Sequence, residues 1–353
     1  MQLNKIIQLI IVISLIQGII CACHRVKKYP TCQTIGNCER LYVADGPEDF
    51  VFDQWHSPPR LIVSSHERRQ PEQFGGIFSL CLTTHASKRL NRLGEDGRFK
   101  AYKPHGMDIR REGTHTYLYV ILHDPNNRDQ RFENVIAVYD VFDHDIQLIQ
   151  VLENSKCLWS PNDLSVLPDG QIYVTNDCRT LTGLLFRRHS SEIAHYQPKT
   201  KTWQIVAKDI FYANGILAQS DRVYISTTLG NELLCFNRTS DGSLSDKKVI
   251  AKLKGLDNIL PYKDKLLITA HTSIWKFLRH YKKKDALSPC LVYCVDPNHP
   301  SNPQNSIPIF GSDGTEISAA STAFIYQNAL YVTQVFDPFI LRCSPLNVTG
   351  RNQ

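Results

Sequence analysis

Short runs of β-branched and aromatic residues alternate along the chain with turns rich in Gly, Pro, Asn and Asp. Such runs, bounded by turn residues, are typical of β-strands. The clearest lie after Cys38, at residues 59–65, 116–122, 135–140, 171–176, 222–227, 265–270 and 328–333. No sustained helical period competes with them, although residues 274–281 fit a short helical insertion. The pattern therefore predicts an all-β chain.

One local motif repeats along the chain. Residues 167–175 (LPDGQIYVT) and 219–227 (QSDRVYIST) place the same turn and strand about fifty residues apart, a spacing typical of β-propeller blades. Six or so such units fill the chain, and no Gly/Ser-rich or Pro-rich linker interrupts them. We expect one six-bladed β-propeller over residues 23–353, in which the starts of strands from successive blades meet at a central channel.

Acidic and amide side chains recur in four dipeptides, each where an apolar run meets a turn. They are Glu48-Asp49, Asn162-Asp163, Asn214-Gly215 and Asp257-Asn258. In a propeller these oxygens would converge, and calcium takes roughly 6–8 oxygen ligands. No EF-hand pattern is present to supply them from one loop. The alternative is that Asn and Asp occur here only because turns favour them.

The first 22 residues differ in kind from the rest. Lys5 precedes an apolar stretch over residues 6–22, which is the layout of a secretory signal peptide. Two alternatives stay open: retention of the segment as a hydrophobic membrane anchor, and lipoprotein-type cleavage at residues 20–23 (ICAC). Each of the three places the globular domain outside the cytoplasm, either secreted or anchored.

The cysteine content fits an oxidising compartment, with eleven cysteines in the chain. Asn237 and Asn347 begin the sequons NRT and NVT, which accept glycans where the host glycosylates secreted proteins. Cys38, just before the first predicted strand, and Cys343, at the end of the last, lie at opposite ends of the repeats. A bond between them would tie both termini into one blade, but spacing alone also allows two buried thiols.

Several other classes of function are not indicated. The formal net charge is only +6, and its clearest cluster, residues 279–284 (RHYKKK), is interpreted as a solvated loop, so nucleic-acid binding is not expected. The absence of a Gly-x-Ser-x-Gly elbow weighs against a serine hydrolase. Cys-x-x-Cys pairs at zinc spacing and His-Glu-x-x-His are also absent, which argues against zinc.

A set of motifs resembles the serum paraoxonase/arylesterase family, in the same order and at similar spacings. The motifs are Cys38, residues 46–49 (GPED), 103–106 (KPHG), 119–125 (YVILHDP), 160–164 (SPNDL), 174–177 (VTND), 211–216 (FYANGI), 256–259 (LDNI) and 321–323 (STA), followed by Cys343. The resemblance extends over nearly everything between these two cysteines. It implies a six-bladed propeller with two calcium ions in its tunnel, one catalytic and one structural. It also implies hydrolysis of lactones and aryl esters, with phosphotriesters as a side activity in some members.

The resemblance further implies roles for individual residues. The ligands of the catalytic calcium would be Glu48, Asn162, Asn214, Asp257 and Asn258. Those of the structural calcium would be Asp49, Asp163 and the backbone carbonyl of Met107. His105 would be the general base and His123 its partner, and His271 would line the pocket. The single intramolecular disulfide would join Cys38 and Cys343.

These residue types suit ester hydrolysis. Calcium bound to an ester carbonyl stabilises the developing negative charge by several kcal/mol. A histidine titrates near neutrality and can accept a proton from water, while a second histidine fixes its tautomer. Because consecutive side chains alternate across an extended strand, Glu48 and Asp49 are expected to face different ions, and so are Asn162 and Asp163.

The sequence departs from the family after Asp177. The family commonly has a histidine there, followed by a long aromatic-rich loop over the pocket. Here Cys178 follows, and the segment up to Tyr196 is shorter and carries residues 187–189 (RRH). The sequence therefore leaves the substrate preference open.

Two other functions also stay open. The chain could be a calcium-stabilised propeller that acts as a non-catalytic binding module. It could also be a sugar-lactonase-like or strictosidine synthase-like enzyme on the same fold. The presence of both His105 and His123 favours the enzyme over the binding module.

Overall fold

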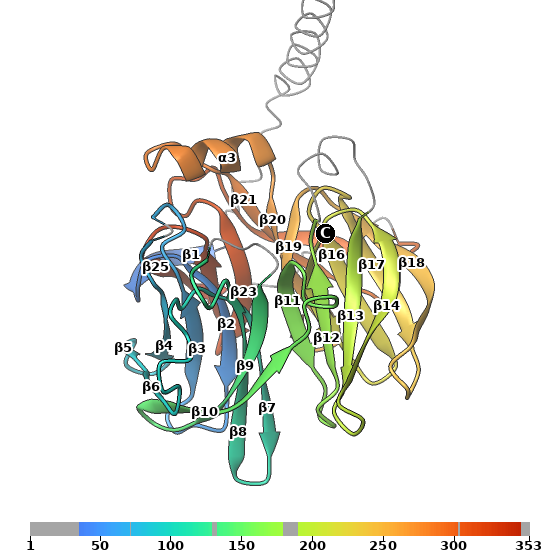
Figure 1. Cartoon of the computed structure of the whole chain (residues 1–353). Helices are drawn as coiled ribbons and strands as arrows, with labels where there is room; N and C mark the ends of the chain where they lie inside the picture. The colour runs from blue at the N-terminus through green and yellow to red at the C-terminus, as the bar shows by residue number, and fades with distance from the viewer. Residues whose placement is uncertain (1–34, 71, 129–132, 179–189, 303, 347–353) are drawn as a thin grey trace, which may run out of the picture. The chain divides into compact units, whose positions relative to one another are not determined.

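The computed structural model describes residues 35–346, except residues 71, 129–132, 179–189 and 303. The strands of this region form six sheets, which are the six blades of a β-propeller (Figure 1). The predicted all-β fold and the number of blades are confirmed. In five sheets consecutive strands pair antiparallel, and in the sixth β1 (Ile35–Tyr42) pairs antiparallel with β25 beside β24 and β23. One further short strand, β6 (Asn91–Leu93), pairs parallel with β10.

The blades follow one another along the sequence. The first three comprise β2 (Pro47–Asp53), β3 (Arg60–Ser65), β4 (Gly76–Cys81) and β5 (Ser87–Arg89); β7 (Pro104–Glu112), β8 (His115–His123), β9 (Asn134–Val141) and β10 (Asp145–Glu153); and β11 (Pro161–Val166), β12 (Ile172–Asn176), β13 (Ser191–Gln197) and β14 (Thr202–Ile210).

The last three blades comprise β15 (Ala213–Ala218), β16 (Arg222–Thr227), β17 (Glu232–Arg238) and β18 (Leu244–Lys252); β19 (Leu256–Tyr262), β20 (Lys265–His271), β21 (Cys290–Val295) and β22 (Ser306–Ser312); and β23 (Ala320–Tyr326), β24 (Ala329–Gln334), β25 (Phe339–Leu346) and β1 (Ile35–Tyr42). Six of the seven strands predicted from the sequence are the second strands of the blades, and the seventh, residues 135–140, is β9.

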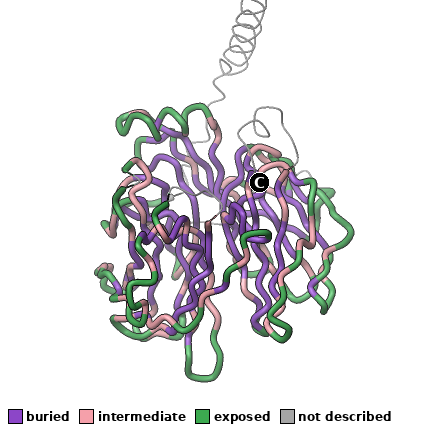
Figure 2. The backbone as a smooth tube through the Cα atoms, in the orientation of Figure 1, coloured by how far each residue is buried: buried purple, intermediate pink, exposed green. Residues whose placement is uncertain are grey.

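The first strands of the blades line the centre. β2 contacts β7, and the contacts continue through β11, β15, β19 and β23 back to β2, which closes the ring. Hydrophobic side chains do not form one central core. Six clusters each fill the space between two neighbouring blades, and a small seventh cluster packs against Phe277 of the helical insertion. Figure 2 shows the inner strands buried, while the turns and much of the outermost strands are exposed. Polar residues therefore line the middle of the propeller.

The first and last strands close the ring. β1 pairs antiparallel with β25, and Cys38 lies opposite Cys343 and is bonded to it across 305 residues of sequence. The predicted disulfide is confirmed, but the placement of Cys38 just before the first strand was wrong, because Cys38 lies inside β1. Strand β1 was not predicted because residues 36–40 (GNCER) lack the β-branched residues that are enriched in strands. Among the described residues, six other cysteines form no disulfide bond.

One helix interrupts the fifth blade between β20 and β21. This helix, α3 (Ile274–Lys282), begins at Ser273, whose side chain accepts a hydrogen bond from the Lys276 backbone N–H. It lies across one end of the propeller, at the top of Figure 1. Its last turn carries basic side chains that suit the negative end of the helix dipole. The basic cluster at residues 279–284 was predicted as a loop, which is wrong for residues 279–282 because they belong to this helix.

Several predictions concern residues outside the described region. They are the signal peptide or anchor at residues 1–22, the sequon at Asn347 and most of the loop after Cys178. The other sequon residue, Asn237, is exposed in β17. Among the described residues, no helix is long and apolar enough to cross a membrane.

Candidate active site

Each of the six innermost strands is distorted at the same place. Its pairing with the second strand shifts register where two residues of the first strand face one residue of the second, as in a β-bulge. The six bulged pairs are Glu48-Asp49, His105-Gly106, Asn162-Asp163, Asn214-Gly215, Asp257-Asn258 and Ser321-Thr322. The propeller therefore brings the four predicted dipeptides together with two pairs that were not recognised as equivalent.

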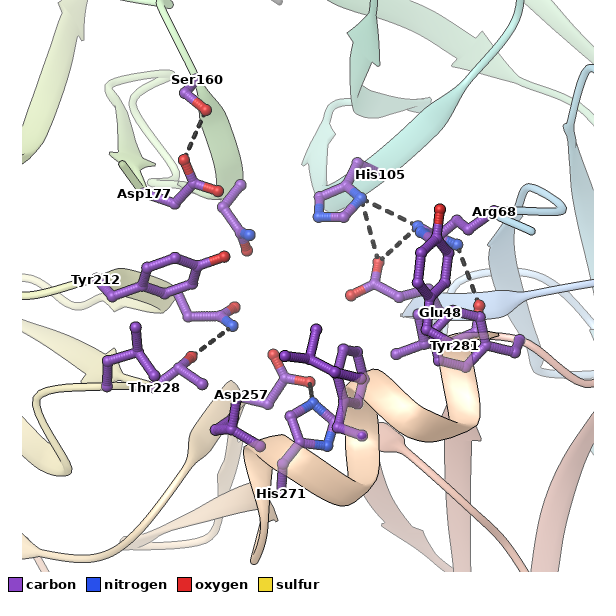
Figure 3. Close-up of a pocket in the computed structure, with 18 of the residues that line it drawn as sticks. Glu48, Arg68, His105, Ser160, Asp177, Tyr212, Thr228, Asp257, His271 and Tyr281 are labelled. Carbon is purple, nitrogen blue, oxygen red and sulfur yellow. Dashed lines mark hydrogen bonds and ion pairs between the residues drawn. The ribbon is translucent and has the colours of Figure 1, made fainter. Parts of the chain in front are cut away.

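The bulge directs neighbouring residues to two different cavities. The first members of five pairs, Glu48, His105, Asn162, Asn214 and Asp257, line a cavity of about 480 Å³ beneath α3 (Figure 3). The second members of four pairs, Asp49, Asp163, Asn258 and Thr322, line a cavity of about 310 Å³ together with Met107. The predicted ligand residues thus divide between the two cavities, with Asn258 on the side of the second.

Hydrogen bonds between blades hold this ring in place. In five blades the single residue opposite the bulge is Ser or Thr, and in four of these its hydroxyl donates to the backbone carbonyl of the first bulge residue in the next blade. The four bonds join Thr175 to Asn214, Ser226 to Asp257, Thr269 to Ser321 and Thr333 to Glu48. These contacts leave the side chains of the bulged residues available for the cavities.

The surroundings of the ring carboxylates do not fully stabilise the ionised form of these groups. Glu48 Oε1 accepts a hydrogen bond from Ser321 at 2.8 Å, and its other oxygen lies 3.4 Å from the Arg68 guanidinium. Burial raises the pKa of Glu48, and Arg68 only partly opposes this effect. Burial raises the pKa values of Asp49 and Asp163 further, although backbone N–H groups donate to both carboxylates. A nearby cation would allow all three to ionise.

Two amide oxygens of the ring lack a hydrogen-bond partner. Asn214 donates its Nδ2 to Thr228 Oγ1 at 2.9 Å, and Asn258 donates its Nδ2 to Thr322 Oγ1 at 2.9 Å. Their Oδ1 atoms are buried without a partner in the described part of the protein. Leaving a buried acceptor unsatisfied is costly, whereas carbonyl and carboxylate oxygens are the ligands that calcium prefers. The donor set therefore fits calcium.

This fit depends on amide and backbone oxygens as well as on carboxylates. Within the described ranges, no three His, Cys, Asp or Glu side chains gather closely enough to hold a metal ion by themselves.

Two histidines face the first cavity beside Glu48. The rings of His105 and His123 lie 5.0 Å apart between centroids and are inclined by 64°. Burial lowers the pKa of His105 well below its usual range, and the positive charge of Arg68 lowers it further. Burial also lowers the pKa of His123. Both rings are therefore neutral at neutral pH and able to accept a proton.

The third predicted histidine, His271, contacts the carboxylate of Asp257. His271 Nε2 lies 2.9 Å from Asp257 Oδ2, and the ring packs on Phe277 of α3 at 4.5 Å between centroids. His271 lines the first cavity, where it was predicted, but its contact orients the Asp257 carboxylate. Figure 3 shows Asp257 and His271 beside α3.

The sequence pattern of the arylesterase family matches residues 69–343. The chain belongs to the arylesterase family. No curated protein matches it significantly. The matched range contains five of the six bulged pairs and ends at Cys343; Glu48-Asp49 precedes it, and the structure places that pair at the equivalent bulge of the first blade.

Several solved structures resemble this chain in fold. A luciferin-regenerating enzyme is 10% identical with a TM-score of 0.59, and the match covers 90% of this chain and 97% of that one. A gluconolactonase from Xanthomonas campestris is 17% identical with a TM-score of 0.57, covering 88% and 90%. Regucalcin from Agrobacterium tumefaciens, described as a calcium-binding protein, is 12% identical with a TM-score of 0.54, covering 88% and 96%.

Sequence reasoning missed three contributors to the site. Arg68 lies on the connection between β3 and β4, where no motif marks it. Asp177 lines the first cavity and accepts a hydrogen bond from Ser160 Oγ at 2.6 Å. The pair Ser321-Thr322 was noted only as part of a motif, although it precedes a predicted strand at a distance similar to that of Asn214-Gly215 and Asp257-Asn258. That common position was the signal that could have identified it.

Proposed function

We propose that the chain is a calcium-dependent hydrolase of lactones and aryl esters. Membership of the arylesterase family supports a hydrolase that acts on small molecules. The observation that carries the finer proposal is the convergence, at one ring, of buried carboxylates, partnerless amide oxygens and two neutral histidines. A buried cation site beside a proton acceptor is the combination that ester hydrolysis by water requires.

The ring residues divide between two proposed calcium ions. Glu48, Asn162, Asn214, Asp257 and Asn258 would hold the catalytic ion, and Asp49, Asp163 and the Met107 carbonyl the structural one. Asn258 lies between the two sets, because it lines the second cavity and its Nδ2 lies 3.5 Å from Glu48 Oε1. Bound at the first set, calcium would supply positive charge against the oxygen of a substrate carbonyl.

The wall of the first cavity favours uncharged, partly apolar substrates. Ile274, Phe277, Leu278 and Tyr281 of α3 face the polar ring, and Phe336 lies beside them. Such a wall excludes water and holds the aryl or alkyl part of an ester, while the polar ring opposite binds the carbonyl. The volume of about 480 Å³ is in the range of small-molecule sites.

The histidines supply acid–base catalysis. Because both are neutral at neutral pH, one of them can take the proton of an attacking water and return it to the leaving oxygen. The contact of His271 with Asp257 keeps that carboxylate in a fixed position in the ring. No side chain of the chain has to form a covalent intermediate in this scheme.

The test is hydrolysis of phenyl acetate and of γ- and δ-lactones by purified protein, with calcium, with a chelator, and after calcium is restored. We expect turnover of both classes with calcium, loss with the chelator and recovery on restoration. Asn214→Ala, which removes one partnerless oxygen, should weaken calcium-dependent activity, whereas Asn231→Ala, on the turn before β17, should not. Turnover unaffected by the chelator would overturn the calcium dependence, and no turnover of any of these substrates would overturn the hydrolase.

A further inference from the structure

Arg68 determines which nitrogen of His105 carries the proton. Its Nη2 lies 3.0 Å from His105 Nδ1 (Figure 3). A guanidinium has only donors, so Nδ1 must be the acceptor and the proton of the neutral ring must sit on Nε2. The Glu48 carboxylate, 3.8 Å from the same Nδ1, is too distant to compete by hydrogen bonding. His105 therefore presents an N–H donor through its remaining nitrogen.

Asn134 imposes the opposite arrangement on His123. His123 Nδ1 lies 2.8 Å from Asn134 Oδ1, and Asn134 Nδ2 donates to the Leu158 backbone carbonyl at 3.1 Å. Because that carbonyl can only accept, the amide nitrogen faces Leu158 and the amide oxygen faces the histidine. Nδ1 of His123 must then donate, and its Nε2 keeps a lone pair that has no hydrogen-bond partner among the described residues.

We propose that His123, through Nε2, is the base that takes the proton from water, and that His105, through Nε2–H, is a hydrogen-bond donor. Arg68 and Asn134 are positioning residues, because they determine which ring nitrogen carries the proton in His105 and in His123. The proposal rests on the proposed hydrolysis of esters in the first cavity, which both histidines line. It reverses the assignment made from the family resemblance, in which His105 is the base.

The proton and electron pairs balance in this scheme. As the water O–H bond breaks, its proton moves to His123 Nε2 and the water oxygen bonds to the carbonyl carbon, whose π electrons move to the carbonyl oxygen. His105 Nε2–H donates a hydrogen bond to the water oxygen and so positions it. The carbonyl then re-forms, the C–O bond to the leaving group breaks, and the leaving oxygen takes the proton from His123. The products are an acid and a phenol from an aryl ester, or one hydroxy acid from a lactone.

The matched variants His105→Gln and His123→Gln separate the two roles. A glutamine amide can donate a hydrogen bond but cannot accept a proton from water at neutral pH. We expect His123→Gln to lower kcat at least about 100-fold and His105→Gln to lower it no more than about 10-fold. The opposite order, or equal losses, would overturn the proposal.

A second measurement does not depend on catalysis. In calcium-loaded protein labelled with ¹⁵N-histidine and assigned with the same two variants, NMR reports which ring nitrogens carry protons. We expect a proton on Nε2 of His105 and on Nδ1 of His123. Arg68→Met should release the tautomer of His105 only, whereas Arg69→Met, whose native side chain contacts His280, should leave both rings unchanged.

The two measurements distinguish the possible failures. If the protein shows the expected tautomers but hydrolyses no ester, the proposed function is contradicted and the hydrogen-bond assignment is still supported. A proton on Nδ1 of His105, or on Nε2 of His123, would overturn the assignment itself, whatever the activity.

Discussion

His195 is a buried titratable residue away from the proposed site. Its Nε2 lies 2.8 Å from Gln171 Oε1, and its ring packs on Tyr173 at 4.7 Å between centroids. Burial, reinforced by the charge of Arg238, lowers its pKa to about 4. Since the folded protein keeps this ring neutral where an unfolded chain would protonate it, His195 makes stability depend on pH.

The sign follows from the two protonation states. Above the unfolded pKa of about 6.5 the ring is neutral in both states and contributes nothing. As the pH falls from there to about 4, only the unfolded chain takes up the proton, so about 2–3 kcal/mol of stability is lost. Urea unfolding between pH 7 and pH 4 should therefore show a shallower loss for His195→Gln than for the natural protein. Equal slopes would contradict this prediction.

At the scale of residues, the sequence predicts side chains that belong to motifs and misses those placed by the fold. Glu48 and His105 are recognisable because they lie in family motifs. Arg68 is not, because its contact with His105 depends on how one blade packs on the next. The tautomers of the two histidines cannot be predicted from the sequence either, because they depend on hydrogen-bond partners that are far away in sequence or belong to no motif.

At the scale of elements, the bulge is the feature that makes the site. Gly215 shows how closely the bulges pack: a Cβ there would lie 2.7 Å from the Asp257 backbone oxygen and 2.7 Å from Asn258 Cα. Gly106 is confined in the same way by Asn162 and Asp163 of the next blade. Glycine therefore leaves room for the bulged pair of the next blade.

We predict that Gly215→Ala destabilises the protein by about 2–4 kcal/mol, because backbone atoms of the next blade cannot move aside cheaply. The control is Gly113→Ala, where a Cβ meets nothing within 4 Å and only the positive φ of 58° opposes the change. That cost should be about 1 kcal/mol. Urea unfolding measures both, and equal effects would show that steric confinement at the bulge is unimportant.

The elements most visible in the sequence are not those that carry the site. The second strands of the blades are continuous β-branched runs, such as residues 222–227, and are readily predicted. The first strands are interrupted by the bulge, which breaks the two-residue alternation on which strand prediction relies. Their polar pairs therefore resemble turns, although they lie within β2, β11, β15 and β19.

At the scale of the whole molecule, the disulfide closes the ring. In the chain-entropy model, a bond that encloses a loop of 305 residues stabilises the folded state by roughly 5 kcal/mol. We predict that the double variant Cys38→Ser/Cys343→Ser loses about 3–5 kcal/mol in urea unfolding. Cys81→Ser, at a free and half-buried cysteine, should lose less than about 1 kcal/mol. Similar losses for both would contradict a closing role.

The most direct test of the central claim, that the bulge ring serves two calcium ions with different tasks, is a calcium titration of chelator-treated protein. Lactone hydrolysis and melting temperature are followed together. We predict two binding events: Asn214→Ala should weaken the one that restores turnover, and Asp49→Asn the one that raises the melting temperature. A single event that changes both readouts in parallel, in both variants, would contradict the account.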